Sequence, residues 1–398
     1  MLTSLALIFL MGLGMASITK ALKLPRIIGM LLTGILLGPH VLNLLDGSIL
    51  SISADLRQMA LIIILLKAGL SLDLSDLKRV GRPAILLSFV PALFELLGFF
   101  LLAPYFLGIN RIEAAVMGAV LAAVSPAVVI PRMVSLMDGH YGTRKSIPQM
   151  IMAGASCDDI FVIVLFSTFT RMAQGQGARV SDFLNIPISI LLGIALGAVV
   201  GLFLSWFFET AFARKHTVRN SAKVVIVLGT SFLLIAIEGW LKEVVSVSGL
   251  LAVVSMACVI KLKSVPFVSK RLSEKFGKLW IAAEVILFVL VGAAVDIRYT
   301  MDAGLAAVGL IFIALVFRAV GVCICMIGTP MNKKERLFCM IAYIPKATVQ
   351  AAIGSVPLAM GLPCGQIVLS VAVLAILITA PLGAIGMDVS YRKLLSKD

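Results

Sequence analysis

A proline interrupts the segment Ala123-Val-Ser125-Pro126-Ala-Val-Val129, which lies near the middle of an apolar stretch over residues 112–136. A second apolar stretch, over residues 334–360, carries the same feature in Tyr343-Ile-Pro345-Lys346-Ala-Thr-Val-Gln350. Proline removes one helical hydrogen bond and clashes with the preceding turn. At membrane depth, the freed backbone groups are tolerated only where protein or a water-filled cavity satisfies them. The two segments therefore predict a pair of interrupted membrane helices, against the simpler alternative of two ordinary proline kinks.

The composition of the whole chain excludes a water-soluble protein. Of its 398 residues, 61% are hydrophobic and 14% are charged, whereas a soluble domain has about 45–50% apolar and about 25% charged residues. A bilayer core about 30 Å thick needs about 20 apolar residues per helix. Thirteen segments meet that length approximately, at residues 2–19, 25–38, 57–72, 84–104, 112–136, 146–171, 184–208, 221–240, 244–260, 279–296, 303–326, 334–360 and 364–386. The expected fold class is an all-α polytopic membrane protein.

The basic residues alternate between successive loops. With thirteen crossings, 24 of the 34 Lys and Arg residues fall in loops on one side and six fall on the other. Loops rich in Lys and Arg stay in the cytoplasm. This predicts a multi-pass protein of the plasma or inner membrane with the N-terminus outside and the C-terminus in the cytoplasm. The net charge of +14 is then a consequence of topology, and no nucleic-acid partner is expected.

A weak internal repeat relates the two halves of the chain. Gly69-Leu-Ser-Leu-Asp73 aligns with Gly292-Ala-Ala-Val-Asp296 at an offset of 223, and the same offset places Glu95 opposite Arg318. The two windows begin on the third and tenth segments, so the second copy crosses the membrane in the opposite sense. We expect a six-one-six inverted repeat, with repeat one over 1–172, a linker helix over 184–208 and repeat two over 221–388. Interrupted helices at corresponding places in such a repeat are the best sequence pointer to a transport site.

Two adjacent acids, Asp158 and Asp159, lie at the centre of the segment 146–171, with no basic residue between Lys145 and Arg171. A charge at the bilayer centre costs at least about 2.5–3.5 kcal/mol on insertion scales. Carboxylate oxygens suit hard cations, and low-dielectric surroundings favour the protonated form of a carboxylate. Such a pair can exchange a proton for a metal ion; the alternative is that ion pairs neutralise both acids permanently.

Three further charges are expected in the same region. Glu95 and Arg318 lie near the middle of their segments, and the repeat predicts a buried pair between them, with a structural and a functional role equally open. Arginine stays protonated, so Arg318 is expected to be a fixed counter-charge, whereas a desolvated Lys346 can lose its proton and neutralise an aspartate when the cation leaves. Ser125 is a candidate hydroxyl ligand, and Thr348 and Gln350 are further candidates.

The pattern Leu24-Pro-Arg-Ile-Ile-Gly29, the Asp158-Asp159 pair and Pro345-Lys-Ala-Thr-Val-Gln-Ala-Ala-Ile-Gly354 resemble the cation/proton antiporters of the NHA branch over nearly the whole chain. The resemblance implies secondary active exchange of sodium or lithium for protons by elevator-type alternating access, in a homodimer. It implies that Asp159 is the main cation and proton carrier, with Asp158 beside it. The charge network around them is then Glu95, Arg318 and Lys346.

The resemblance also implies a division of the chain. A core, or transport, part takes in about 84–171 and 303–386, and a dimerisation part takes in the remaining helices. Pro126, Pro345 and Thr348 supply the backbone of the two crossed, discontinuous helices. Neither an enzymatic activity nor a cofactor is expected, and the partners are monovalent cations, protons and membrane lipid. Many relatives with an Asp-Asp pair have lysine where Arg318 stands, so the resemblance leaves open whether exchange is electrogenic.

Several other functions remain as alternatives to sodium/proton exchange. A potassium/proton antiporter differs only in its cation, and a sodium-coupled organic-anion symporter of similar fold takes up sodium without proton countertransport. An ion channel gives flux without proton coupling. An intramembrane aspartyl protease is the least favoured alternative, because it needs two aspartates that face each other and share a proton, which neighbours on one helix cannot do.

Overall fold

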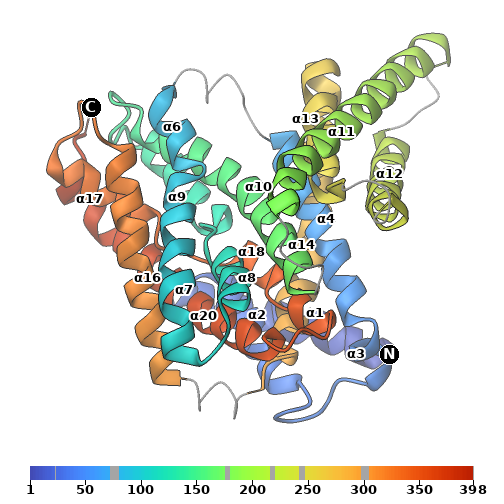
Figure 1. The fold of residues 1–398 in the computed structure, drawn as a ribbon. Helices are drawn as coiled ribbons and strands as arrows, with labels where there is room; N and C mark the ends of the chain where they lie inside the picture. The colour runs from blue at the N-terminus through green and yellow to red at the C-terminus, as the bar shows by residue number, and fades with distance from the viewer. Residues whose placement is uncertain are drawn as a thin grey trace. The chain divides into compact units, whose positions relative to one another are not determined.

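The computed structural model describes residues 1–22, 24–71, 80–174, 180–215, 220–241, 247–296 and 304–397, and these ranges are helical throughout apart from short connections (Figure 1). The helices are α1 (Leu2–Ala21), α2 (Arg26–Leu37), α3 (Gly47–Ser51), α4 (Ser53–Ser71), α6 (Arg82–Leu87), α7 (Val90–Leu107), α8 (Arg111–Leu121), α9 (Pro126–Asp138), α10 (Ile147–Ala173), α11 (Val180–Lys215), α12 (Asn220–Leu241), α13 (Gly249–Lys263), α14 (Pro266–Ala293), α16 (Gly304–Cys325), α17 (Lys333–Ala342), α18 (Thr348–Ile353), α19 (Val356–Ala359) and α20 (Gly365–Leu394). In the described ranges, extended pairing is limited to an isolated bridge between Tyr141 and Lys397. The all-α class is confirmed.

Each of the thirteen predicted segments coincides with one helix or with consecutive helices of the structure. Among the described residues, nine helical stretches are long and apolar enough to cross a membrane, and α2 and the stretch Thr348–Ala359 are shorter apolar helices. The exact number of crossings stays a prediction. Some helices are longer than predicted: α14 begins at Pro266 and α20 continues to Leu394. A hydropathy window finds only the apolar part of a helix, whereas the backbone hydrogen bonds continue into the polar ends.

The chain divides into two compact units, which we describe separately. Unit 1 comprises residues 1–57, 73–174 and 285–398, and unit 2 comprises residues 58–72 and 175–284. The interrupted helices and all the predicted site residues belong to unit 1. The division into a transport part and a dimerisation part stays a prediction.

In unit 2, helices α11 and α13 pack through glycines spaced four residues apart on α11. A Cβ atom at Gly197 would lie 2.1 Å from the carbonyl oxygen of Ala252, and one at Gly201 would lie 2.8 Å from that of Met256. Small residues at this spacing allow the backbones of two membrane helices to approach closely. Gly193 makes the same kind of approach to the carbonyl oxygen of Ser248.

In unit 1, the contact between α7 and α16 displays the inverted repeat directly. A Cβ atom at Gly98 would lie 3.1 Å from the ring of Phe317, and one at Gly321 would lie 3.2 Å from the Cβ atom of Phe94. Phe94 and Phe317, like Gly98 and Gly321, are related by the offset of 223. Each repeat therefore presents a phenylalanine to the glycine of the other. The quoted motif at Gly69 ends at Asp73, which lies outside the described residues.

The two interrupted helices also begin with the same capping device. The side chain of Asn110 accepts a hydrogen bond from the Glu113 amide while the Glu113 carboxylate accepts one from the Asn110 amide, at 2.9 Å each. Asn332 and Glu335 repeat this arrangement at the start of α17. Such a capping box satisfies amides of the first turn that have no helical partner. Each repeat therefore starts its interrupted helix in the same way.

Candidate cation site at two helix breaks

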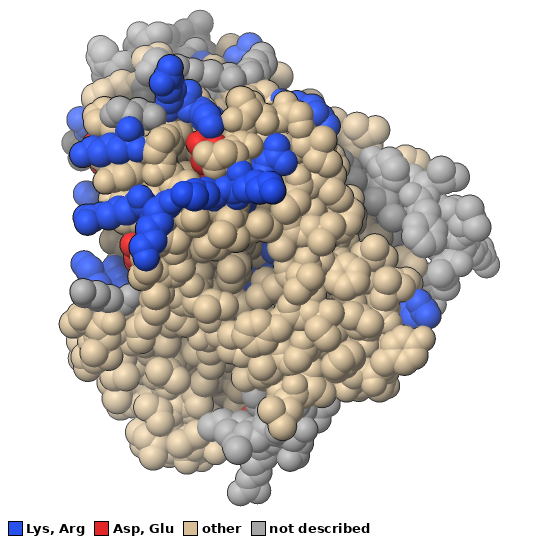
Figure 2. Space-filling model, turned by 90° about the vertical axis from the view of Figure 1, so that its left-hand side faces the viewer, with Lys and Arg blue, Asp and Glu red and all other residues tan. Residues whose placement is uncertain are grey.

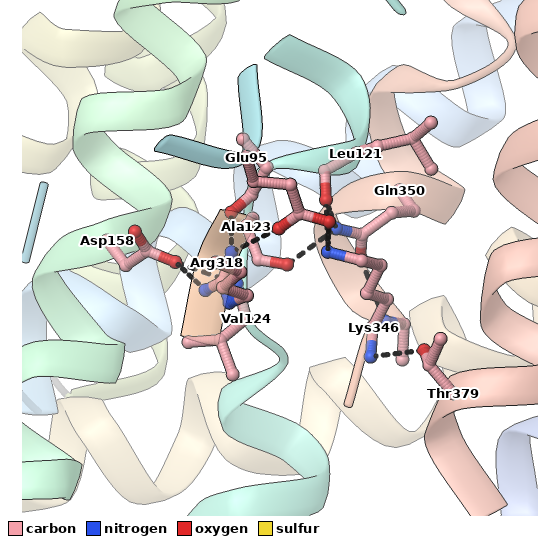
Figure 3. Close-up of polar contacts among 11 residues, drawn as sticks. Glu95, Leu121, Ala123, Val124, Asp158, Arg318, Lys346, Gln350 and Thr379 are labelled. Carbon is pink, nitrogen blue, oxygen red and sulfur yellow. Dashed lines mark hydrogen bonds and ion pairs between the residues drawn. The ribbon is translucent and has the colours of Figure 1, made fainter. Parts of the chain in front are cut away.

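The two interrupted helices meet at their breaks (Figure 3). α8 ends at Leu121 and α9 begins at Pro126, while α17 ends at Ala342 and α18 begins at Thr348. The amide of Ser125 donates a 2.8 Å hydrogen bond to the carbonyl oxygen of Pro345. Both predicted prolines therefore lie at the crossing of two discontinuous helices.

The break after Leu121 leaves carbonyl groups at the end of α8 without helical partners. Lys346 Nζ donates to the carbonyl oxygen of Leu121 at 2.5 Å, and Arg318 Nη1 donates to that of Ala122. Gln350 Nε2 donates to the carbonyl oxygen of Ala123 at 2.8 Å. The C-terminal end of a helix carries partial negative charge. Two cationic side chains and an amide therefore satisfy the end of α8.

Gln350 also organises the second break. Its Oε1 accepts a 2.8 Å hydrogen bond from the amide of Ala347, just before α18 begins. The next amide back, that of Lys346, donates to Thr379 Oγ1 on α20 at 3.0 Å. α20 approaches this break closely at Gly383, where a Cβ atom would lie only 2.4 Å from the Pro345 ring. Side chains of two elements thus replace the missing helical hydrogen bonds.

Glu95, on α7, bridges two cations at the centre of the cluster (Figure 3). Its Oε2 lies 2.6 Å from Arg318 Nη1, and its Oε1 lies 2.6 Å from Lys346 Nζ. All three side chains are buried, and buried charges require this kind of pairing. The expected contact between Glu95 and Arg318 is present. Among the described residues, Lys346 forms its ion pair with Glu95 and not with either aspartate.

Asp158, on α10, is held by one of its two oxygens. Oδ2 accepts a 2.7 Å hydrogen bond from the amide of Val124 in the first break and lies 3.2 Å from Arg318 Nη2. Oδ1 is buried and has no hydrogen-bond partner within the described part of the chain. Asp158 therefore faces the charge network with one oxygen and leaves the other available to a ligand.

Asp159 differs from the other buried charges. It is 7% exposed, and across the described ranges it forms no ion pair or hydrogen bond; its Oδ1 is buried and unpaired. The buried hydroxyls of Ser125 and Thr348, one from each break, also lack partners there. An unsatisfied buried polar atom costs about 1–3 kcal/mol. Unpaired carboxylate oxygens on α10 and unpaired hydroxyls at both breaks are of the kind that suits a hard cation.

The cluster is one positive charge short of neutrality when every group is ionised. Its carboxylates are Glu95, Asp158 and Asp159, and its cations are Arg318 and Lys346. One monovalent cation or one proton restores the balance. No group of three or more His, Cys, Asp or Glu that could hold a metal is present in the described residues, so a bound cation would need hydroxyl or backbone oxygens besides the aspartates.

Tyr343 is a site residue whose contacts the sequence reasoning missed. Its ring lies 5.5 Å from the guanidinium of Arg318, and a Cβ atom at Gly154 would lie 2.2 Å from its hydroxyl. Gly154 is one helical turn before Asp158 on α10. A glycine inside a helix carries an entropic cost. Gly154 in the middle of an apolar segment was therefore the sequence signal that another group packs closely against the helix at that position.

Crossed, interrupted helices in an inverted repeat, around a buried carboxylate pair, define a secondary ion transporter. The chain belongs to the sodium/hydrogen exchanger family, because its residues 5–388 match the transmembrane sodium/hydrogen exchanger. It is a cation/proton antiporter of the NHA type, as the motifs predicted.

Two curated relatives agree with the family assignment, and one solved structure agrees with the fold. Human sodium/hydrogen exchanger 9B2 is 34% identical over 402 residues, covering 97% of this chain and 72% of the relative. Human sodium/hydrogen exchanger 9B1 is 30% identical over 397 residues, covering 94% and 73%. The structure of the sodium proton antiporter MjNhaP1 from Methanocaldococcus jannaschii at pH 8 matches with a TM-score of 0.83 at 24% identity, over 99% of this chain and 98% of that one. This structural likeness confirms the fold.

Proposed function

We propose that this protein exchanges Na⁺ or Li⁺ for H⁺, with the cation and the proton competing for Asp159. The observation that carries the proposal is a buried carboxylate with no cationic partner in the described part of the chain, in a cluster one positive charge short of neutrality. The relatives that are named sodium/hydrogen exchangers support this pair of ions.

The neighbouring residues take distinct roles in this proposal. Asp158 supplies the oxygen that faces away from Arg318, and Ser125 and Thr348 supply hydroxyl ligands from the two breaks. Glu95, Arg318 and Lys346 keep the charge around the site fixed, because Glu95 pairs with both cations. Ser125 precedes α9 without capping it through its side chain, and its hydroxyl has no hydrogen-bond partner in the ranges that the structure describes, which supports a ligand role.

The charge balance also gives a physical reason for obligatory exchange. With either a proton or a monovalent cation on Asp159, the cluster is neutral. Without either, one buried carboxylate is uncompensated, and breaking a buried charge pair typically costs about 3–5 kcal/mol. The transporter with an empty site is therefore slow to switch the site from one side of the membrane to the other. After one ion is released, the other must bind before the site can return.

The remaining parts of the proposal concern the whole transporter. We propose that the protein is a homodimer that works by alternating access of the elevator type. We also propose that it lies in a plasma or inner membrane with the C-terminus in the cytoplasm. The family resemblance supports the first two. The distribution of Lys and Arg between the loops supports the orientation.

The test measures proton movement in proteoliposomes on addition of Na⁺, Li⁺ or K⁺. The wild type should release protons, and Asp159→Asn should release none, because an amide neither binds a proton nor balances a cation. Asp138→Asn is the matched control, an exposed acid at the end of α9, and should exchange like the wild type. An Asp159→Asn variant that exchanges at the wild-type rate would remove Asp159 from the mechanism.

Competition between the ions also predicts a pH dependence. Where the proton occupies the site, lowering the pH by one unit should raise the half-saturating Na⁺ concentration by up to about tenfold, because the cation must displace the proton. Measuring exchange against Na⁺ concentration at several pH values checks this. A half-saturating concentration that stays constant across the pH range would contradict competition at one carboxylate.

A further inference from the structure

Basic side chains gather at the end of unit 1 where α17 begins and α20 ends. We call this group the basic band; its exposed members are Arg82, Lys333, Lys334, Arg392, Lys393 and Lys397. Figure 2, viewed from the side on which α16 and α17 lie in Figure 1, shows Lys and Arg side chains concentrated in the upper part, with few acidic atoms between them. On this face, the positive charge is therefore concentrated at one end.

Contacts between distant segments fix the basic band in place. Arg82 Nη1 donates to the carbonyl oxygen of Ile327 at 3.3 Å, which ties the start of α6 to the end of α16. The amide of Gly142 donates to the carbonyl oxygen of Ser396 at 2.8 Å, which ties the loop after α9 to the segment after α20. That loop is tied to α17 by the ion pair between Lys145 and Glu335, also at 2.8 Å.

The acidic residues near the basic band are largely committed to other partners. Glu335 is buried and pairs with Lys145. Asp388 accepts hydrogen bonds from Arg132 Nε and Nη2, at 2.9 and 3.0 Å. The exposed Asp138, at the end of α9, offsets one of six positive charges. The basic band therefore presents positive charge to an external partner.

Exposed apolar side chains lie directly beside the cations. Ile327, whose carbonyl group binds Arg82, is 57% exposed, and Leu337, one turn after Lys333, is 44% exposed. Val389, one turn before Lys393, is 66% exposed. A charged group next to apolar surface at the end of a membrane helix matches a phospholipid, which carries a phosphate and acyl chains, better than a soluble acidic partner.

We propose that the basic band binds the headgroup phosphate of an anionic phospholipid in the adjoining leaflet, with the acyl chains against Ile327, Leu337 and Val389. Near an anionic membrane surface, each Lys or Arg contributes about fivefold to affinity. The lipid then contacts the beginning of α17, the helix that leads to the break at Tyr343. It also contacts the end of α20, which holds that break through Thr379.

The test compares binding of phosphatidylglycerol, phosphatidylcholine with the same acyl chains, and inorganic phosphate to the purified full chain, by native mass spectrometry. The variant Lys333→Gln/Lys334→Gln/Lys393→Gln should bind phosphatidylglycerol at least about tenfold more weakly, with phosphatidylcholine unchanged. The matched control, Lys263→Gln/Lys270→Gln/Lys278→Gln, removes three exposed lysines from unit 2 and should bind phosphatidylglycerol like the wild type.

A charge-conserving variant, Lys333→Arg/Lys334→Arg/Lys393→Arg, guards against loss of folding and should retain phosphatidylglycerol binding. The proposal fails if the glutamine variant and its control lose affinity equally, because the effect is then one of net charge. It also fails if the glutamine variant binds like the wild type, or if inorganic phosphate binds as tightly as phosphatidylglycerol, which would indicate a simple anion site.

Discussion

Glu95 is the buried carboxylate on which both cations of the cluster depend, since it contacts Arg318 and Lys346 at 2.6 Å each. Glu95→Gln leaves two buried positive charges without their main partner. Breaking a buried pair in this way typically costs about 3–5 kcal/mol, so the variant should melt well below the wild type in detergent. Glu274→Gln, at an exposed position in unit 2, should melt like the wild type. Equal melting of the two variants would show that Glu95 does not hold the cluster together.

The close contact between Gly154 and Tyr343 can be tested by substitution. Gly154→Ala places a Cβ atom 2.2 Å from the tyrosine hydroxyl, and overpacking of this kind costs about 1–3 kcal/mol. Thermal melting and exchange rate should both fall. Adding Tyr343→Phe removes the hydroxyl and should restore part of the loss. If the double variant is no better than Gly154→Ala, the clash lies elsewhere, for example at Leu87, which is also close.

The sequence identified the charged residues of the site, but it did not identify the backbone groups that bind them. Asp158, Asp159, Glu95 and Arg318 stand out because a charge within an apolar segment needs a reason. The amide of Val124, which binds Asp158, could not be predicted in the same way. Every residue carries the same backbone groups, and only the geometry of a break decides which of them are free.

In the two interrupted helices, the prolines located both breaks but not the residues at which the helices end. α17 already ends at Ala342, three residues before Pro345, because a proline disturbs the turn that precedes it. Gln350 was predicted as a possible ligand, yet it joins the two breaks by hydrogen bonds. Which way a side chain turns at an irregular backbone depends on the partner element, and the sequence of one helix does not contain that information.

The packing of α11 on α13 gives a prediction for unit 2. Gly197→Ala places a Cβ atom 2.1 Å from the backbone oxygen of Ala252, so the two helices must separate and the melting temperature should fall. Gly229→Ala is the matched control, because a Cβ atom at that position on α12 has no neighbour within 4 Å among the described residues. This control should be neutral or stabilising by up to about 1 kcal/mol. Equal melting of the two variants would contradict close helix packing at Gly197.

The alternation of basic loops along the chain predicts the orientation in the membrane. Single cysteines introduced at Ala54 and at Lys333, both exposed, in a background without the six native cysteines, should differ in labelling. A membrane-impermeant maleimide added to intact cells should modify the cysteine at 54 and leave that at 333 until the cells are opened. Labelling in the reverse order would place the C-terminus outside.

The reciprocal contacts of α7 and α16 have a consequence for how such a molecule can be built. Phenylalanine and glycine occupy equivalent places in both halves, so each half presents the same pair of residue types to the other. Between the phenylalanine and the glycine of each half lies one charged residue, which is Glu95 in the first half and Arg318 in the second. Two identical half-length chains meeting about the same axis would bring like charges together, which is costly away from water. Joining unlike halves in one polypeptide removes that penalty and leaves a symmetric framework with an electrically polar centre.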